Sequence, residues 1–389
     1  MKWIAEFTAG VLVLACLSPS ADAADPAPPP AVPVQGAQAG AMPPGPPPLP
    51  PLVGDRGPVV HFEDVTSDPG AQQGGHFVAG AGLYLIKPFF DTNPAFRTST
   101  TTVTGGIFNV TSTTQTQQQD FEYDLAAAPL IWIGYVADNG LGVRGRWWSF
   151  DQGSRFEMLD QAGVSITSAA PQGLSIHSPG SVLFPGVNAD SLAFNSNLRL
   201  DVWDLEATQD FRLGGWALTV SGGARYVHMA QNYNAYRTNP GGVQGVLLVT
   251  DNGEALHSGH NFNGAGPTVA LEVRRPLGDT GLALYGNARG SLLYGDGKQH
   301  TTLSQQFSGV VGVTPFDMVH TSDVVGSRDD LLPIVELELG AEYGMDMGRL
   351  RPFIRTGVVG QTWFGAGNAT SVTGNLGFLG LTATAGVNY

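Results

Sequence analysis

The residues best suited to chemistry are charged side chains that recur at every second position in several stretches of the chain. Arg144 and Arg146 have this spacing, and so do Asp204 and Glu206. Side chains two positions apart in a β-strand lie on the same face of the sheet, so each stretch predicts a strand with one charged face. We expect this face to line the interior of a barrel and to comprise Arg144, Arg146, Asp204, Glu206, Arg225, Glu272, Arg274, Arg289, Glu336, Glu338, Glu342 and Arg355.

The sign of the charge on this face changes from one predicted strand to the next. The basic stretch at Arg144 and Arg146 precedes the acidic one at Asp204 and Glu206, which predicts ion pairs across adjacent strands. Arginine is well suited to such pairs because its planar guanidinium matches a carboxylate. The charged face either forms a path for small solutes or is a salt-bridged interior that holds a barrel together. Both interpretations stay open, because ~8 strands give a filled interior and ~16–18 strands give an open channel.

Ten segments of alternating apolar and polar residues must position these charges. The clearest is the last, in which Leu379, Leu381 and Val387 share one parity while Gly380, Thr382 and others share the opposite one. No helix or second layer is predicted to cover the apolar faces, so we expect them to meet lipid. The fold class is therefore all-β, a transmembrane antiparallel up-and-down β-barrel of about ten strands (8–12). The predicted strands are 77–89, 120–136, 141–151, 198–211, 216–228, 262–274, 281–295, 330–344, 350–364 and 376–389.

The connections between these strands alternate between short and long, which is typical of outer-membrane barrels. The long ones are rich in Thr, Ser, Gly, Asn and Gln, and we expect loops at 90–119, 152–197, 229–261, 296–329 and 365–375. The short connections contain residues that are typical of turns. They are Ala137 to Gly140, Arg212 to Gly215, Arg275 to Thr280 and Met345 to Arg349.

Aromatic residues of the apolar parity lie near the strand ends, which predicts a girdle at each membrane interface. Near the long connections are Tyr123, Trp147, Tyr226 and Tyr294, and near the short turns are Tyr135, Phe211, Trp216, Tyr343 and Tyr389. The terminal Tyr389 also suits recognition of the last strand by the barrel-assembly machinery.

The first part of the chain has no strand pattern. Lys2, the apolar run at 11–17 and the small residues Ala21 and Ala23 predict a signal peptide at 1–23. Residues 24–75 are rich in Pro, Ala and Gly and predict a disordered periplasmic linker, whereas 76–389 forms the barrel. The single cysteine, Cys16, lies within the signal peptide, although cleavage before it would instead make it a lipid anchor. A mature chain without cysteine has no disulfide and no thiolate site.

Several stretches resemble the Legionella-type major outer membrane protein family, which is usually described as pore-forming. They are LYLIKPFF at 83–90, GVRGRWWSFD at 142–151, DLEATQ at 204–209, GGARY at 222–226, FNGAGP at 262–267, RTG at 355–357, QTW at 361–363 and GFLGL at 377–381. The resemblance implies passive transport of small solutes or ions across the bacterial outer membrane. The chain departs from the family in its Pro-rich linker and its lack of mature cysteines, so an oligomer, if formed, has no disulfides.

Two other functions stay open. The barrel could be a non-conducting structural or adhesive protein, since its long connections could bind something outside the cell. It could also be an outer-membrane hydrolase, but we expect no enzyme, because no acidic residue accompanies the densest histidine cluster, His257 to His260, at a telling spacing. The remaining histidines near the long connections are His177, His228, His300 and His320.

Composition limits the partners. The net charge of −14 argues against nucleic acid. Only 13% of the residues are charged, against about 25% in soluble proteins. We expect outer-membrane lipid and lipopolysaccharide as surroundings, no cofactor, and no metal, because the carboxylates do not have the spacing of a calcium loop.

Overall fold

The computed structural model describes residues 75–106, 109–159, 164–169, 174–178, 190–238, 243–244, 249–311 and 314–389. The predicted signal peptide and all but the last residue of the predicted linker lie outside the described residues. Every regular element in the described ranges is a β-strand. None of these ranges contains a helix with the length and hydropathy needed to cross a membrane.

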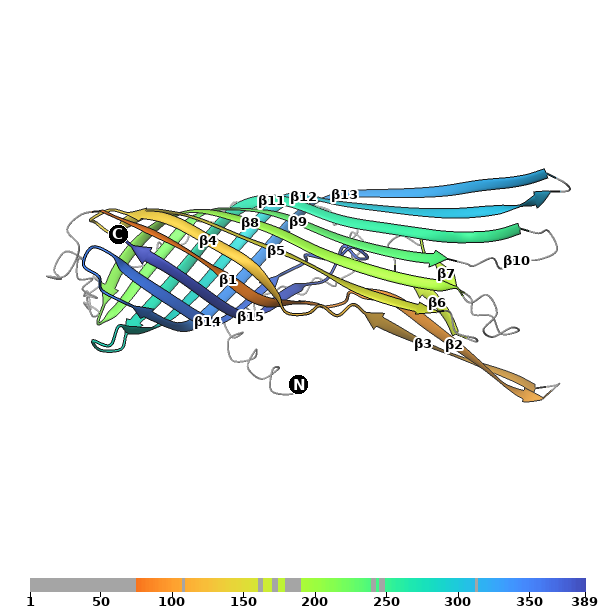
Figure 1. Ribbon diagram of the computed structural model, residues 1–389, viewed down its shortest axis with the longest axis horizontal. Coiled ribbons are helices and arrows are strands. Elements are labelled where there is room, and N and C mark those ends of the chain that lie inside the picture. Colours follow the sequence, from red (N-terminus) through yellow and green to blue (C-terminus); the bar gives the residue numbers. More distant parts are fainter. Residues whose placement is uncertain are drawn as a thin grey trace, which may run out of the picture. The chain divides into compact units, whose positions relative to one another are not determined.

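Ten strands pair in an antiparallel ring, which confirms the predicted fold class (Figure 1). The ring closes where the last strand pairs with the first, and Phe77 and Tyr389 exchange two backbone hydrogen bonds of 2.9 Å there. In ring order the strands are β1 (His76–Phe90), β4 (Ala126–Val136), β5 (Leu141–Leu159), β8 (Ser191–Leu213), β9 (Trp216–Thr238), β11 (Val249–Pro276), β12 (Leu282–Val311), β13 (Thr314–Gly344), β14 (Arg351–Trp363) and β15 (Leu376–Asn388).

Each of these strands contains or closely matches one of the ten predicted segments. The predicted short turns are also present, and we call this end of the barrel the turn side. The tightest turn joins β8 to β9 through Gly214 and Gly215, whose φ values of 52° and 84° are readily adopted by glycine. The opposite end is called the extension side.

The prediction of long loops on the extension side is wrong for much of their length. Strands β11, β12 and β13 have 28, 30 and 31 residues, whereas about 9–11 residues are enough to cross a membrane. Beyond Asp296, β12 and β13 continue as a ladder to the pair Val311 and Thr314, a length of roughly 50 Å. Hydroxyl and amide side chains do not prevent pairing, because the backbones supply the ladder bonds and the polar side chains face water.

A second sheet lies on the extension side. Its order is β3 (Asn109–Asp120), β2 (Pro94–Gly106), β6 (Val164–Ser168) and β7 (His177–Ser178). The predicted connection at 90–119 is thus mainly the β2–β3 hairpin, in which threonines such as Thr101 and Thr114 face each other, with their hydroxyls 3.1 Å apart. The two-residue strand β10 (Val243–Gln244) pairs with β11.

The apolar parity faces outward, as predicted. Ile133, Leu205 and Leu339 keep 64%, 64% and 67% of their surface exposed, and a barrel in a membrane presents such side chains to lipid. The predicted girdle residue Tyr123 is an exception, because it is only 3% exposed and its hydroxyl lies 2.7 Å from that of Ser196. Strand β4 begins at Ala126 rather than at 120, so the parity of a strand does not apply to Tyr123. The other predicted girdle residues lie on outward parity.

Closure by β15 gives a first testable prediction. Deleting Val387 to Tyr389 removes the pairing of Val387 with Ala79 and both hydrogen bonds to Phe77. Unpaired backbone is not tolerated in hydrocarbon, so the truncated chain should fail to close and be degraded. Loss of the heat-modifiable band in gel electrophoresis measures this failure.

The matched control deletes residues 309–316 at the tip of the β12–β13 ladder. That change leaves the ring intact, so the heat-modifiable band should persist. Wild-type yield of the C-terminal truncation would show that ring closure does not depend on these residues.

Candidate functional site: the filled interior of the barrel

The structure brings the predicted charged residues together inside the barrel. Neighbouring strands supply the predicted cross-strand pairs, because their registers place opposite charges side by side. Arg144 lies opposite Glu206, with a nitrogen to oxygen distance of 2.9 Å, and Arg146 lies opposite Asp204 at 3.3 Å. The prediction of alternating charge between adjacent strands is therefore confirmed for β5 and β8. It is also confirmed for β13 and β14, where Glu342 and Arg355 pair at 2.6 Å.

Other ion pairs join strands that are not neighbours in the ring. Arg225 on β9 pairs with Asp204 on the neighbouring β8 at 2.6 Å and also contacts Glu336 on the more distant β13 at 2.5 Å. Arg355 on β14 reaches Glu272 on β11 at 2.8 Å. The sequence did not predict these contacts, because pairing across a barrel depends on its diameter and stagger. They join strands three places apart in the ring, and the pair of Arg146 on β5 with Glu336 on β13, at 3.5 Å, joins opposite walls, so these side chains fill the interior at this level.

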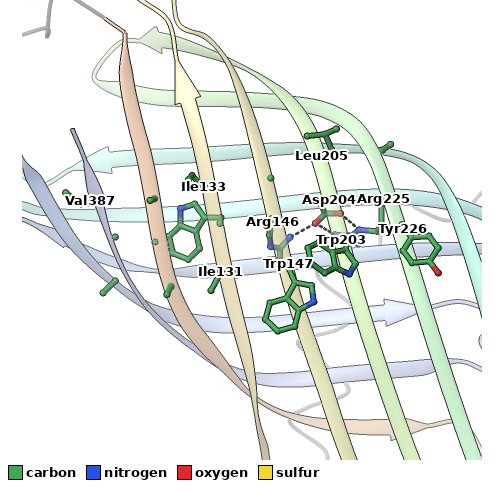
Figure 2. A pocket seen from close by; sticks show the side chains of 18 of the residues that line it. Ile131, Ile133, Arg146, Trp147, Trp203, Asp204, Leu205, Arg225, Tyr226 and Val387 are labelled. Atoms are coloured by element: carbon green, nitrogen blue, oxygen red, sulfur yellow. Dashed lines mark hydrogen bonds and ion pairs between the residues drawn. The ribbon is translucent and has the colours of Figure 1, made fainter.

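The centre of the network excludes water. The side chains of Arg225, Asp204 and Glu206 have no exposed surface, and Arg289, which contacts Glu206, is 2% exposed. Figure 2 shows Arg146, Asp204 and Arg225 joined by hydrogen bonds and ion pairs. Buried charges of this kind require full pairing, since each ion loses its hydration.

The turn-side part of the network is more open. The side chains of Arg274, Arg355 and Arg144 are 33%, 22% and 21% exposed. Glu338 differs from the other members because it pairs with no arginine among the described residues and accepts a hydrogen bond of 2.7 Å from Tyr285 instead. The network thus has a wet end on the turn side and a dry centre.

A layer of aromatic side chains lies on the extension side of the charges. Trp148 and Trp363 are fully buried, and their ring centroids lie 6.4 Å apart. Phe378 contacts both rings edge-on, at 6.3 Å from Trp148 and 6.4 Å from Trp363. Tyr84 joins this layer to the charges, since its ring lies 5.8 Å from Trp148 and its hydroxyl contacts Arg146. Sequence parity could have found Trp148, because it shares the parity of Arg144 and Arg146.

The connection between β14 and β15 folds inward. Together with the charged network and the aromatic layer, it obstructs the interior of the barrel. We call Gly365 to Asn375 the plug loop. Ser258 on β11 donates a hydrogen bond of 2.6 Å to the carbonyl oxygen of Ala369, and Gln299 on β12 donates one of 3.1 Å to the same oxygen. Gln231 on β9 donates to the Gly367 carbonyl oxygen at 3.3 Å. The prediction of an external loop at 365–375 is wrong for its central part, because Asn368 and Ala369 are only 2% and 4% exposed.

The two histidines of the cluster lie on opposite faces of β11. His257 and His260 have opposite parity on β11, so His257 points outward and bonds Asn234 at 2.7 Å, whereas His260 is 4% exposed. Burial lowers the pKa of His260, which favours its neutral form. Ser258, which lies between them, is used to hold the plug loop. Within the described ranges, no group of three His, Cys, Asp or Glu residues has the arrangement of a metal site.

A comparison with known protein families identifies the family of this chain. The model of the family described as Legionella pneumophila major outer membrane protein precursor matches residues 73–384. The chain belongs to this family. Membership in the Legionella major outer membrane protein family, together with the closed strand ring, makes the protein an outer-membrane β-barrel.

Several solved structures match the chain at low sequence identity and with low TM-scores. The outer membrane protease OmpT from Escherichia coli is 13% identical, with 81% of this chain and 96% of that chain covered and a TM-score of 0.37. The monoaromatic hydrocarbon channel CymD is 8% identical, with coverages of 80% and 88% and a TM-score of 0.24. A mutant of the monoaromatic hydrocarbon channel TodX is 8% identical, with coverages of 82% and 91% and a TM-score of 0.20. No curated protein sequence matches the chain.

Proposed function

We propose that this protein is a closed outer-membrane barrel that anchors a β-sheet structure at the cell surface, and that its resting state does not conduct. The observation that carries this proposal is the filled interior. Arg225 and Trp148 are both 0% exposed, although they lie at different levels of the barrel. A water-filled channel would leave inward charges hydrated, whereas this centre is dry. The proposed role is structural or adhesive and involves no catalysis.

The long strands support the display part of this proposal. The part of β13 beyond the ring, 314–331, has exposed apolar side chains, and Val319 and Val325 are 62% and 69% exposed. The β2–β3 hairpin adds exposed polar residues such as Thr101 and Thr114. Exposed strands held on a rigid barrel provide a surface for an extracellular partner.

Single-cysteine labelling tests the display. Because the only cysteine is Cys16 in the predicted signal peptide, Val325→Cys would carry the only thiol of the mature chain. A membrane-impermeant maleimide should label Val325→Cys on intact cells to near completion. Asp138→Cys, in an exposed turn between β4 and β5, should react only after the outer membrane is permeabilised.

The reverse labelling pattern would show that the extension side faces the periplasm. Protease provides an independent check of the same orientation. Added to intact cells, it should cut within 152–197 or 229–261 and spare 25–58.

Passive transport of small solutes or ions is a second candidate function. The accessibility of Arg144, Arg274 and Arg355 favours it, because these side chains form a charged, hydrated mouth on the turn side. Transport would require displacement of the plug loop and rearrangement of the aromatic layer. A gated channel of this kind would show brief openings that become more frequent when the contacts to Ala369 are removed, for example by Ser258→Ala combined with Gln299→Ala.

A further inference from the structure

Asparagines are concentrated on the outward face of three neighbouring strands on the extension side. The strands are β8, β9 and β11, which lie side by side in the sheet (Figure 1). We call this surface the asparagine face. Its six asparagines are Asn195, Asn197, Asn232, Asn234, Asn261 and Asn263.

The asparagine face meets water beyond the membrane interface. Its outward direction follows from the alternation of burial on β9, where Gln231 and Tyr233 are 3% and 1% exposed, whereas Asn232 between them is exposed. Asn232 is six residues from the girdle residue Tyr226, about 20 Å along the strand. The headgroup layer of a bilayer is only about 5–8 Å thick, so Asn232 lies outside it even on a tilted strand.

Strand register places asparagines of adjacent strands opposite each other. Asn197 on β8 pairs with Asn232 on β9, and Asn195 pairs with Asn234. On β11 the residue opposite Asn232 is Gly259. A Cβ at Gly259 would lie only 3.3 Å from Oδ1 of Asn232, so the Asn232 amide leans over a position that has no side chain. Four amide groups therefore lie together on an open surface.

These amides have unused hydrogen-bonding capacity. Asn195, Asn232 and Asn261 make no side-chain hydrogen bond to any other residue in the described ranges. Asn234 accepts one hydrogen bond of 2.7 Å from Nδ1 of His257, which fixes its orientation and leaves its NH₂ group available. A ligand could thus use both the donors and the acceptors of the asparagine face.

Asparagine is an unusual residue for these positions. It is depleted in β-strands, because its short amide competes for the backbone hydrogen bonds. The β2–β3 hairpin is also exposed to water, but it uses threonine and glutamine instead, as at Thr101 and Gln115. Contact with water alone therefore does not explain six asparagines on three neighbouring strands. A local preference that is broken repeatedly at one place points to function.

The chemistry of the face fits an uncharged sugar chain. An amide donates and accepts hydrogen bonds at the same time, as sugar hydroxyls do. The row that runs from Gly153 through Asn197 and Asn232 to Gly259 carries no charge, and the net charge of −14 repels anions. Tyr236, which shares the outward parity of Asn232, is 36% exposed and offers a ring on which the C–H face of a sugar can pack.

We propose that the asparagine face binds an uncharged oligosaccharide, with its hydroxyls hydrogen-bonded to Asn197, Asn232 and Asn234 and one sugar packed against Tyr236. Neighbouring strands are about 4.8 Å apart, which is similar to the length of one sugar unit, so a chain that crosses the three strands presents one unit to each. The inference rests on the proposed display role and deepens it, because it names the chemistry of the partner.

Fluorescence anisotropy with labelled oligosaccharides tests this site. The full-length mature barrel is purified in a detergent without a sugar headgroup and freed of lipopolysaccharide. The probes are cellohexaose and chitohexaose, which are uncharged, and a hyaluronan hexasaccharide, which is anionic. We expect saturable binding of at least one uncharged probe, at least tenfold tighter than binding of the hyaluronan probe.

The amides are then removed by Asn232→Thr combined with Asn234→Thr. Threonine keeps these positions polar and suits a strand better, so the variant should fold at least as stably as the wild type. Its affinity for the uncharged probe should fall at least tenfold. Gln115→Thr combined with Gln117→Thr is the matched control, because it removes two exposed amides from β3 and should leave the affinity unchanged. If the asparagine variant gives no heat-modifiable barrel, Asn197→Thr on β8 decides the question.

Two sources could supply such a sugar chain, and competition distinguishes them. An uncharged O-polysaccharide, freed from lipid A by mild acid, should displace the probe if the chain comes from lipopolysaccharide of the same cell surface. If it does not displace the probe, the chain comes from another surface. Either result supports a sugar site and identifies its source.

Three results would overturn the proposal. The first is no binding of either uncharged probe, the second is equal or tighter binding of hyaluronan, and the third is equal affinity of the wild type and the asparagine variant. These measurements are made in detergent, where the orientation and conductance of the barrel play no part. A negative result would therefore leave the display role, which the labelling of Val325→Cys tests, unaffected.

Discussion

Replacing Arg225 by methionine is expected to lower the free energy of unfolding by about 3 kcal/mol. The substitution keeps much of the side-chain volume but removes the guanidinium that pairs with Asp204 at 2.6 Å and with Glu336 at 2.5 Å. Both carboxylates are buried, so water cannot replace the lost partner. The expected cost is at the lower end of the range for a broken buried pair, about 3–5 kcal/mol, because Arg146 and Arg289 still contact these carboxylates.

Chemical unfolding in detergent micelles, followed by the heat-modifiable band, measures this change. Arg199→Met is the matched control, because it removes an exposed partner of Asp201 on the outside of the barrel. Exposed pairs contribute at most about 1 kcal/mol, so the control should unfold almost like the wild type. Equal effects of the two substitutions would show that water reaches the centre of the network.

The aromatic layer gives the second large effect. Trp148→Ala and Trp363→Ala should each lower the free energy of unfolding by about 3–5 kcal/mol, since each removes a fully buried indole. The two rings are in contact, so the double variant should differ from the sum of the single changes by about 0.5–3 kcal/mol.

Trp203→Ala is the control for the aromatic layer. Trp203 is 54% exposed on the outward face, so lipid or detergent can fill the space left by its ring. We expect its effect to be clearly smaller than that of Trp148→Ala. If Trp148→Ala were no more destabilising than Trp203→Ala, the layer would not be a packed core.

The barrel could be predicted because the sequence features that define it lie within single strands and turns. A period of two fixes which side chains share a face, and this parity correctly placed Arg225 and Glu336 inside and Ile133 and Leu339 outside. Turn residues such as Gly214 and Gly215 marked the strand ends. Local patterns also predicted the pairing of Arg146 with Asp204, because the two strands are consecutive among the predicted barrel strands.

The filling of the interior by side chains could not be predicted from these patterns. It depends on contacts between residues far apart in the chain, such as Arg225 with Glu336 and Ser258 with Ala369. Whether opposite walls touch follows from the diameter and stagger of the ring, which single-strand patterns do not encode. The plug loop was misassigned for the same reason, because a short polar connection has no periodicity that shows which way it folds.

The strand extensions were missed for a different physical reason. Outside the membrane, the alternation of apolar and polar residues is no longer required, since both faces can meet water. Polar residues such as Thr321 and Asp323 therefore look like loop, although the ladder of β13 continues through them and their side chains are exposed. The absence of an apolar face predicts solvent exposure more reliably than it predicts a loop.

Single-channel recording in a planar lipid bilayer tests the closed interior most directly. Proteoliposomes that carry a measured amount of the wild-type barrel are fused with the bilayer. They also contain an open porin at low ratio, whose current shows that fusion has occurred. The dry network, the aromatic layer and the plug loop predict that fusion events add the porin current and no steady conductance from this protein. A steady, ohmic conductance that scales with the amount of wild-type barrel would contradict the closed state and favour passive transport.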